Sequence, residues 1–192
     1  LARRIRARRL KHGMLELDLP EVEVVRDVDG RVSDVKPADT SFSHKIIEMF
    51  MVEANEAVAR GLTELGIPFL RRTHGLPKNL ADGGLRSFLR VLGHRLPTDA
   101  DRFDLQRLLE EVRGHDDGFA VHLAVLKSMQ AAEYSPEPMG HYALASEHYG
   151  HFTSPIRRYA DLSVHRLFYR LVTSKKHRVT NSASNAMEDL AA

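Results

Sequence analysis

The chain has 192 residues, of which 43% are hydrophobic and 28% charged, ordinary values for a globular domain that buries a core. It contains no cysteine, so disulfides and thiolate metal sites are excluded, and it shows neither a signal peptide nor an apolar run long enough to cross a bilayer. The net charge of +2 is modest, but the basic residues cluster, which matters more than the total for an anionic partner. The chain starts at Leu1 rather than Met, which suggests a fragment or an excised domain.

The first part of the chain predicts a basic helical segment followed by a β-hairpin. Residues 1–11, LARRIRARRLK, show a weak helical pattern, and two interpretations stay open: a solvated helix end, or direct contact with RNA or DNA. Residues 14–36 alternate apolar and polar side chains, and Asp29-Gly30 is a typical turn signal, so we expect a hairpin here. Pro20 restricts the first strand to a sheet edge or a strand end.

The strongest helical pattern lies at residues 43–65. A broad apolar stripe repeats at helical spacing, Ser41 or Ser43 is the expected N-cap, and Gly66 ends the helix. Glu48 and Asn55 are two turns apart, so they share a face close to the stripe. A carboxylate in that position is usually a boundary residue, which is the alternative to a functional role.

The middle of the chain predicts several short elements. We expect a strand, three helices and a second short strand at residues 67–74, 77–92, 99–113, 119–132 and 142–144. The first strand contains a basic cluster of Arg71, Arg72 and His74.

Three aspartates near the start of the second of these helices superficially resemble a metal site. Thr98 is expected to open that helix and Gly114 to close it. Asp99, Asp101 and Asp104 then fall in its first turns, where the helix dipole favours acidic side chains. We therefore interpret them as helix-start residues rather than as metal ligands.

The sharpest motif lies within residues 141–166, HYALASEHYGHFTSPIRRYADLSVHR. Thr153 and Ser154 are good N-cap residues and Pro155 suits a first helical position, so a helix is predicted to begin near Ser154. Arg157 and Arg158 would then lie in its first turn, where the dipole disfavours cations.

The placement of these two arginines allows two interpretations. Free N–H groups, a hydroxyl and two guanidinium groups at one helix N-terminus would suit a phosphate. Alternatively, Arg158 pairs with Asp161 and Arg157 points to water. A nucleophile pair of Ser154 with His151 is conceivable, but a serine in this position is more commonly an N-cap.

Three segments together resemble the RNB catalytic domain of the ribonuclease II and ribonuclease R family. They are HGMLELDLPEVEV, HKIIEMFMVEANEAVA and LKSMQAAEYSPEPMGHYALASEHYGHFTSPIRRYADLSVHRL, and the resemblance extends from about Leu1 to Leu171. It implies an α+β fold: a mainly helical fragment of an RNB domain with a β-hairpin and short strands near the RNA channel. Residues 1–172 would form the C-terminal portion of that domain, and residues 173–192 a polar linker or the truncated start of a following segment.

The resemblance also implies an activity. Members of this family degrade single-stranded RNA processively from its 3′ end to nucleoside 5′-monophosphates, in a magnesium-dependent hydrolysis, and a cytoplasmic location without membrane contact is expected. The motif match places Arg157 at the scissile phosphate and Glu48 at the 3′-terminal nucleotide. Supporting RNA contacts fall on Thr153, Ser154, Arg158 and Tyr149, although Tyr149 could equally belong to the core.

The chain departs from the family pattern in several places. The family's metal-binding aspartates, in a DxxxxxDxDD-like segment, have no counterpart here, and neither do its flanking OB-fold RNA-binding domains. Met49 stands where many members have a second acid, and Leu17 where many have an aromatic that could stack on a base. The magnesium ligands are therefore expected outside this chain, and the chain alone is expected to be inactive.

Two other functions are alternatives to this one. A non-catalytic RNA-binding protein built on a degenerate RNB fold remains the main alternative. A sequence-specific DNA-binding protein is disfavoured, because the arginines lie at a helix start and no helix-turn-helix partner precedes them.

Overall fold

The computed structural model describes residues 1–39, 41–77 and 83–173, which form six α-helices, a 3₁₀ turn and two small antiparallel sheets. In chain order the elements are α1 (Ala2–Lys11), β1 (Val22–Arg26), β2 (Val32–Pro37), α2 (Phe42–Glu64), β3 (Arg71–Thr73), α3 (Gly84–Val91), α4 (Arg102–Glu111), α5 (Gly118–Ser128), β4 (Glu133–Ser135), η1 (Tyr142–Leu144) and α6 (Tyr159–Thr173). The fold is α+β and mainly helical, as the family resemblance implied.

The long helix α2 connects most of the fold. Its buried residues recur every three or four positions, as expected for an amphipathic helix, and they are Met49, Val52, Asn55, Ala59 and Leu62. At its N-terminal half, Met49 packs with Ala2 and Met14, which joins α2 to α1. At its C-terminal half, Ala59 and Leu62 pack with Phe69 and with residues of α6.

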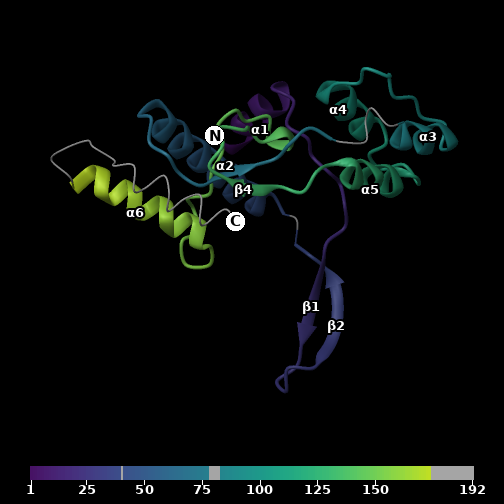
Figure 1. Cartoon of the computed structure of the whole chain (residues 1–192). Helices are drawn as coiled ribbons and strands as arrows, with labels where there is room; N and C mark the ends of the chain where they lie inside the picture. The colour runs from purple at the N-terminus through teal and green to yellow at the C-terminus, as the bar shows by residue number, and fades with distance from the viewer. Residues whose placement is uncertain (40, 78–82, 174–192) are drawn as a thin grey trace.

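A second core lies at the other end of the molecule (Figure 1). There α3, α4 and α5 pack around leucines and valines that are almost fully buried, including Leu89, Leu105 and Val121. Leu15 and Tyr142 belong to the same cluster, and Leu17 packs against it. Leu17, the position where many family members carry an aromatic, therefore contributes to packing.

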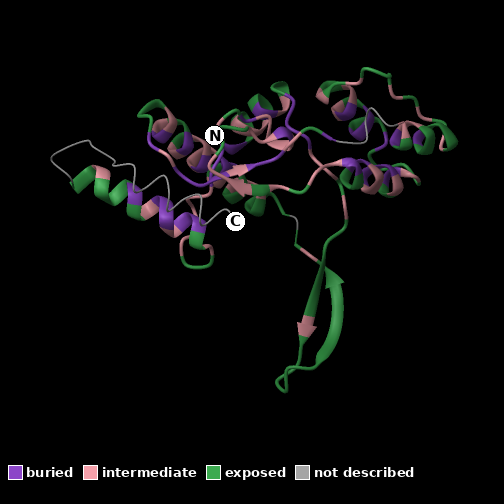
Figure 2. Ribbon diagram, in the orientation of Figure 1, coloured by how far each residue is buried: buried purple, intermediate pink, exposed green. Residues whose placement is uncertain are grey.

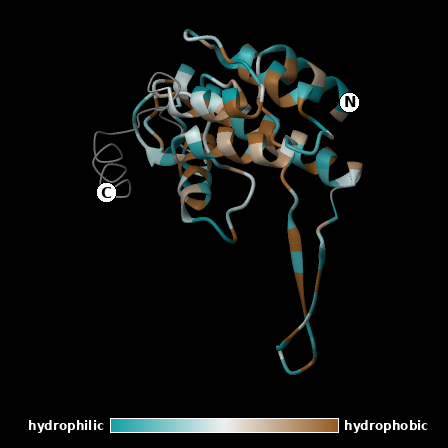
Figure 3. Cartoon of the chain, turned by 90° about the vertical axis from the view of Figure 1, so that its right-hand side faces the viewer, coloured by the Kyte–Doolittle hydropathy of each residue, from teal (hydrophilic) through white to brown (hydrophobic). Residues whose placement is uncertain are grey.

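The predicted hairpin exists, but only its outer part is paired. Strands β1 and β2 are antiparallel with Val24 opposite Val35, and the turn runs through Asp29 and Gly30 as predicted. The preceding residues 15–21 are not in a strand. The hairpin projects from the body and is almost wholly exposed, and of its valines only Val25 is half-buried (Figures 2 and 3).

Strand β3 lies within the predicted strand 67–74 and pairs with β4, which follows α5. The predicted helix 119–132 was too long, because α5 ends at Ser128 and the chain then extends toward β4. The prediction of a strand at residues 142–144 was wrong. These residues form the 3₁₀ turn η1, whose first N–H donates to the carbonyl of His74.

The N-cap residue of α4 differs from the predicted one. The N-cap is Asp101 rather than Thr98, and it forms a capping box with Asp104, in which each side chain accepts a backbone N–H of the other. These two aspartates therefore serve the helix start, as the dipole argument suggested.

Some predictions lie outside the described residues. The start of the predicted helix 77–92 is among them, and α3 is described from Gly84. So is nearly all of the predicted linker 173–192, since α6 is described through Thr173. Among the described residues, no helix is both long and apolar enough to cross a membrane.

Candidate functional site

The motif HFTSPIRR forms a loop between the core and α6, and not the helix start that was predicted. Helix α6 begins at Tyr159, and residues 155–157 form a turn in which the N–H groups of Arg157 and Arg158 both approach the carbonyl of Ser154. Ser154 is therefore not the N-cap, and both arginines precede the helix. Arg157 therefore does not lie at a helix N-terminus, and the helix dipole gives no support to phosphate binding there.

Long-range hydrogen bonds explain why the local cap signals failed. The backbone N–H groups of Phe152 and Thr153 donate to Oδ1 of Asn55 on α2, at 2.8 and 3.2 Å. The next N–H, that of Ser154, donates to Oδ1 of Asp161 on α6 at 2.8 Å. Three consecutive amides are thus bound by side chains of two helices, which holds the loop in a non-helical path.

The carbonyl side of the loop is fixed as well. Nε2 of His165 lies 2.7 Å from the carbonyl oxygen of Phe152, and it must be the donor because a carbonyl only accepts. The two rings stack with centroids 4.0 Å apart and planes 7° from parallel. We call Asn55, Asp161 and His165 the loop clamp.

The two arginines have different environments. Nη2 of Arg158 lies 2.7 Å from Oδ1 of Asp161, a carboxylate with no exposed surface, so the predicted alternative of an Arg158–Asp161 pair is confirmed. Arg157 is exposed, and its side chain has no hydrogen bond or ion pair with any described residue. Of the two, Arg157 alone is therefore available to a ligand.

The other motif residues are mostly enclosed. Ser154 and Thr153 are half-buried, and Oγ1 of Thr153 is buried without a partner among the described residues. Tyr149 is 6% exposed and its hydroxyl accepts a hydrogen bond from Nδ2 of Asn55 at 3.1 Å. The ring of Tyr149 is therefore part of the core, the alternative that the sequence had left open, and burial raises the pKa of its hydroxyl.

Neutral histidines surround this tyrosine. The ring centroids of His141 and His151 lie 5.2 and 6.0 Å from that of Tyr149. Burial, followed by the charge of Arg158, lowers the pKa of His151 to about 4. Burial, followed by the proximity of His74, lowers the pKa of His141 to about 3. His141 and His151 are therefore neutral near pH 7.

Glu48 lies on the same helix as Asn55 but is exposed. Its carboxylate is 2.8 Å from Nζ of Lys45, an exposed pair that contributes little to stability. Met49 beside it is buried against α1, so the position where many family members carry a second acid is apolar and enclosed here.

Part of the positive charge of helix α1 is paired with acidic side chains. Arg8 and Arg9 both pair with Glu53 of α2, and Arg9 also reaches Glu56, at 2.8 Å. Of the two interpretations left open for residues 1–11, internal pairing therefore accounts for part of the charge.

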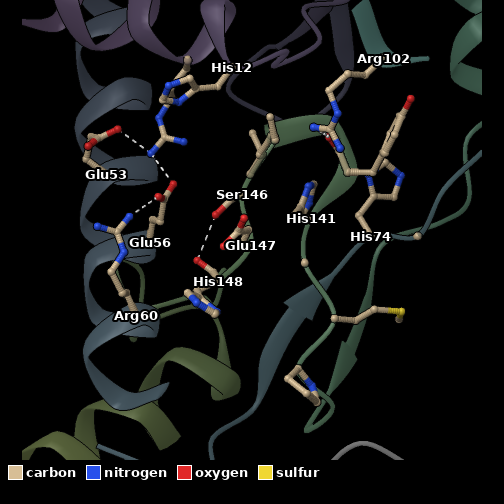
Figure 4. Close-up of a pocket in the computed structure, with 18 of the residues that line it drawn as sticks. His12, Glu53, Glu56, Arg60, His74, Arg102, His141, Ser146, Glu147 and His148 are labelled. Carbon is tan, nitrogen blue, oxygen red and sulfur yellow. Dashed lines mark hydrogen bonds and ion pairs between the residues drawn. The ribbon is translucent and has the colours of Figure 1, made fainter. Parts of the chain in front are cut away.

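A cavity of about 1530 Å³ lies between the charged residues of α1 and α2 and the segment that contains His141 and His148 (Figure 4). Its wall on α2 consists of paired charges, for example Arg60 with Glu56 at 2.6 Å. Neither Arg157 nor Glu48 lines it.

The second basic cluster, Arg71, Arg72 and His74, also makes its contacts within the protein. Arg71 is buried, with its guanidinium carbon 4.3 Å from the centroid of Phe69, and burial lowers its pKa. Arg72 stacks on Tyr134 in the same way, at 4.8 Å. His74 donates from Nε2 to the carbonyl of Gln130. These three residues serve the fold around β3.

The described residues contain no cluster of three or more His, Asp or Glu side chains that could hold a metal ion. The part of the chain that the structure describes therefore offers no donor set for the magnesium that the family resemblance implies.

The comparisons with known proteins agree with this architecture. The family model of the RNB domain matches residues 1–174, and the chain belongs to the RNB domain family. It is 38% identical to ribonuclease R of Aquifex aeolicus over 178 residues, which are 92% of this chain and 25% of that protein. It is 41% identical to ribonuclease R of Thermotoga maritima over 163 residues, 84% of this chain and 23% of that protein. The chain thus spans about a quarter of these relatives.

Solved structures show the same relationship. Ribonuclease R of Mycoplasma genitalium, in complex with ribose-methylated single-stranded RNA, matches 99% of this chain with a TM-score of 0.90 and 28% identity, over 31% of that chain. Yeast Ssd1, described as a pseudonuclease, matches 99% of this chain with a TM-score of 0.69 and 23% identity, over 24% of that chain. The latter likeness concerns the fold alone.

The sequence singled out Arg157 as a candidate and predicted the Arg158–Asp161 pair, but it gave no role to Asn55 and none to His165. Asn55 carried a usable signal, since a carboxamide within an otherwise apolar helical stripe needs a hydrogen-bond partner when buried. Its partners lie 97 and 98 residues away, so spacing could not have identified them.

Proposed function

We propose that this chain provides the phosphate-binding part of a 3′→5′ exoribonuclease that hydrolyses single-stranded RNA to nucleoside 5′-monophosphates. The observation that carries the proposal is the exposed Arg157, which has no partner among the described residues, on a loop whose N–H groups at residues 152–154 are bound by side chains of α2 and α6. Membership of the RNB family and likeness to ribonuclease R support it.

The proposed role of Arg157 is electrostatic. Hydrolysis of a phosphodiester builds negative charge on the equatorial oxygens of the scissile phosphate, and a guanidinium group held in place stabilises that charge. Because the loop is fixed before substrate arrives, little reorganisation is needed at the moment of reaction.

Glu48 is proposed to contact the 3′-terminal nucleotide, since it is exposed on α2 and its only described partner is the exposed Lys45. Thr153 and Ser154 are proposed to support the RNA path from the loop. Arg158 and Tyr149 support it indirectly, because their polar groups are used inside the protein.

Magnesium, when bound, would assist the hydrolysis, and we propose that its aspartate ligands lie outside this chain together with the OB-fold RNA-binding domains. The described residues offer no ligand cluster, which supports this division. It predicts that the 192-residue chain alone does not hydrolyse RNA. A cytoplasmic location is part of the same proposal.

A non-catalytic RNA-binding protein is the second candidate. The likeness to a pseudonuclease at a TM-score of 0.69 favours keeping it, because the fold is compatible with both functions. Retention of an exposed arginine at position 157 favours the enzyme, since binding of RNA by shape and charge does not require that one position.

A degradation assay separates the two candidates. The intact protein that contains this sequence is incubated with 5′-labelled single-stranded RNA and magnesium, and the enzyme predicts progressive shortening from the 3′ end with release of nucleoside 5′-monophosphates. Binding without any shortening would favour the RNA-binding alternative. Shortening by the 192-residue chain alone would contradict the proposed location of the metal ligands.

A further inference from the structure

We infer that Asn55 and Asp161 are positioning residues for Arg157: they bind the loop that carries it to α2 and α6 and thereby set where its guanidinium meets the phosphate. This inference rests on the proposed function. It concerns residues that do not themselves reach the substrate, since Asn55 is 2% exposed and Asp161 has no exposed surface.

The chemistry of the Asn55 carboxamide is well defined. Its two contacts at 2.8 and 3.2 Å are with backbone N–H groups, which only donate, so the atom facing them must be the oxygen. Nδ2 then faces the hydroxyl of Tyr149 at 3.1 Å, which fixes the amide plane. Both lone pairs of Oδ1 are used by the two consecutive amides of Phe152 and Thr153.

Packing alone does not explain an asparagine in this position. The other buried residues of α2 are Met49, Val52, Ala59 and Leu62, all apolar. A buried carboxamide costs free energy unless it is hydrogen-bonded, so an aliphatic residue would serve the core better if the loop were not attached here. The specific contribution of Asn55 is therefore to the path of the loop.

Asp161 completes the arrangement from the other helix. Its Oδ1 accepts both the N–H of Ser154 and a guanidinium N–H of Arg158. The same carboxylate thus fixes the third amide of the loop and occupies one of the two arginines. The adjacent arginine, Arg157, has no partner among the residues that the structure describes.

The attachment to α2 has a consequence for substrate geometry. Glu48 and Asn55 lie on one continuous helix, seven residues or about 10 Å apart along its axis. Because Asn55 binds the loop to this helix, it sets the separation between the arginine proposed for the phosphate and the carboxylate proposed for the 3′-terminal nucleotide.

Amide hydrogen exchange in this chain directly tests the hydrogen bonds that Asn55 and Asp161 accept from the loop. The N–H groups of residues 152–154 are expected to be protected in the native chain. In Asn55→Ala, exchange should accelerate at Phe152 and Thr153, while Ser154 keeps its protection through Asp161. In Asn55→Asp, protection should return, because a carboxylate oxygen also accepts two amides and the Tyr149 hydroxyl can turn to donate. Unchanged exchange in Asn55→Ala would overturn the inference.

Kinetics of the intact protein on single-stranded RNA test the positioning role. Asn55→Ala is expected to lower kcat about a hundredfold with a much smaller change in KM, since misplacement of a transition-state group by about 1 Å has effects of that order. Asn55→Asp should recover most of the loss, and thermal unfolding checks that both variants are folded. Equal losses in Asn55→Ala and Asn55→Asp, or a rise in KM alone, would overturn the role.

A parallel measurement on Arg157→Ala separates this inference from the function on which it rests. If Arg157→Ala removes turnover while Asn55→Ala retains it, the positioning role is wrong and the proposed function stands. If Arg157→Ala leaves turnover unchanged, the proposed function is wrong, and the positioning role is wrong with it.

Discussion

The carboxylate of Asp161 accepts a hydrogen bond from Nη2 of Arg158 at 2.7 Å, and this contact gives the two arginines of the motif different roles. The carboxylate has no exposed surface and the side chain of Arg158 is 20% exposed, so the pair is largely removed from water. Arg157 in the preceding position has no internal partner among the described residues. Arg158 therefore belongs to the fold, whereas Arg157 is available to a ligand.

The first prediction compares the two arginines in a stability measurement. Arg158→Ala leaves the buried Asp161 charge without its cation and should lower the free energy of unfolding by about 3 kcal/mol. Arg157→Ala removes only an exposed side chain and should change it by less than about 0.5 kcal/mol. Urea denaturation of the chain measures both changes in the free energy of unfolding. Equal losses would contradict the different roles of Arg157 and Arg158.

The second prediction concerns Gly150, which precedes the loop. A Cβ at this position would lie 2.8 Å from Cε2 of Phe69, a ring that is 1% exposed and cannot easily move. Gly150→Ala should therefore lower the free energy of unfolding by about 1–3 kcal/mol. Gly61→Ala on α2 is the control, because a Cβ there meets nothing within 4 Å. Similar stability of the two variants in urea would argue against this close packing.

The third prediction concerns acid pH. The pKa of His151 is lowered to about 4 in the folded chain, chiefly by burial, against an ordinary value of 6.5. The unfolded chain therefore binds this proton at a higher pH than the folded chain, and the free energy of unfolding falls as pH drops from 6.5 toward about 4. His141, whose pKa is lowered to about 3, adds to the same slope.

His151→Gln tests this effect, because glutamine does not titrate and can still form a hydrogen bond with Tyr134, whose hydroxyl lies 2.7 Å from Nδ1 of His151. The melting temperature of the variant, followed between pH 6.5 and pH 4.5, should fall less steeply than that of the native chain. An unchanged slope would show that His151 is not a source of the acid sensitivity.

The fourth prediction concerns the projecting hairpin. Val24 and Val35 face each other across the strands and are 48% and 55% exposed. Replacing both with threonine should change the free energy of unfolding by less than about 0.5 kcal/mol per site. Met49→Ala, at a residue that is 1% exposed, should cost about 2–5 kcal/mol under the same conditions. A loss from the valines as large as that from Met49 would mean that the hairpin packs on the body in solution.

Sequence reasoning located the elements whose signal is local. Helix α2 was predicted because its apolar stripe is long, and the hairpin because Asp29-Gly30 follows an alternating segment. In the described chain both faces of the hairpin are largely exposed. A residue pattern gives the periodicity of a strand, but it does not show what covers the strand.

The same reasoning failed where distant residues decide the backbone. Thr153, Ser154 and Pro155 are a strong helix-start signal, but Asn55 and Asp161 bind the amides of residues 152–154 and the helix begins only at Tyr159. Likewise, the N–H of Tyr142 bonds to the carbonyl of His74, and residues 142–144 form a 3₁₀ turn rather than a strand. Local propensities are weak compared with such long-range bonds.

The most direct test of the central claim compares Arg157→Ala with Arg90→Ala in the intact protein. Arg90 is an exposed arginine on α3, at the opposite end of the molecule from α6 (Figure 1). Turnover on single-stranded RNA is measured together with affinity for the same RNA. Arg157→Ala should lower turnover by roughly two to three orders of magnitude with a much smaller loss of affinity, while Arg90→Ala changes neither. Turnover and affinity that fall together in Arg157→Ala, or turnover that is unchanged, would contradict a transition-state contact between Arg157 and the scissile phosphate.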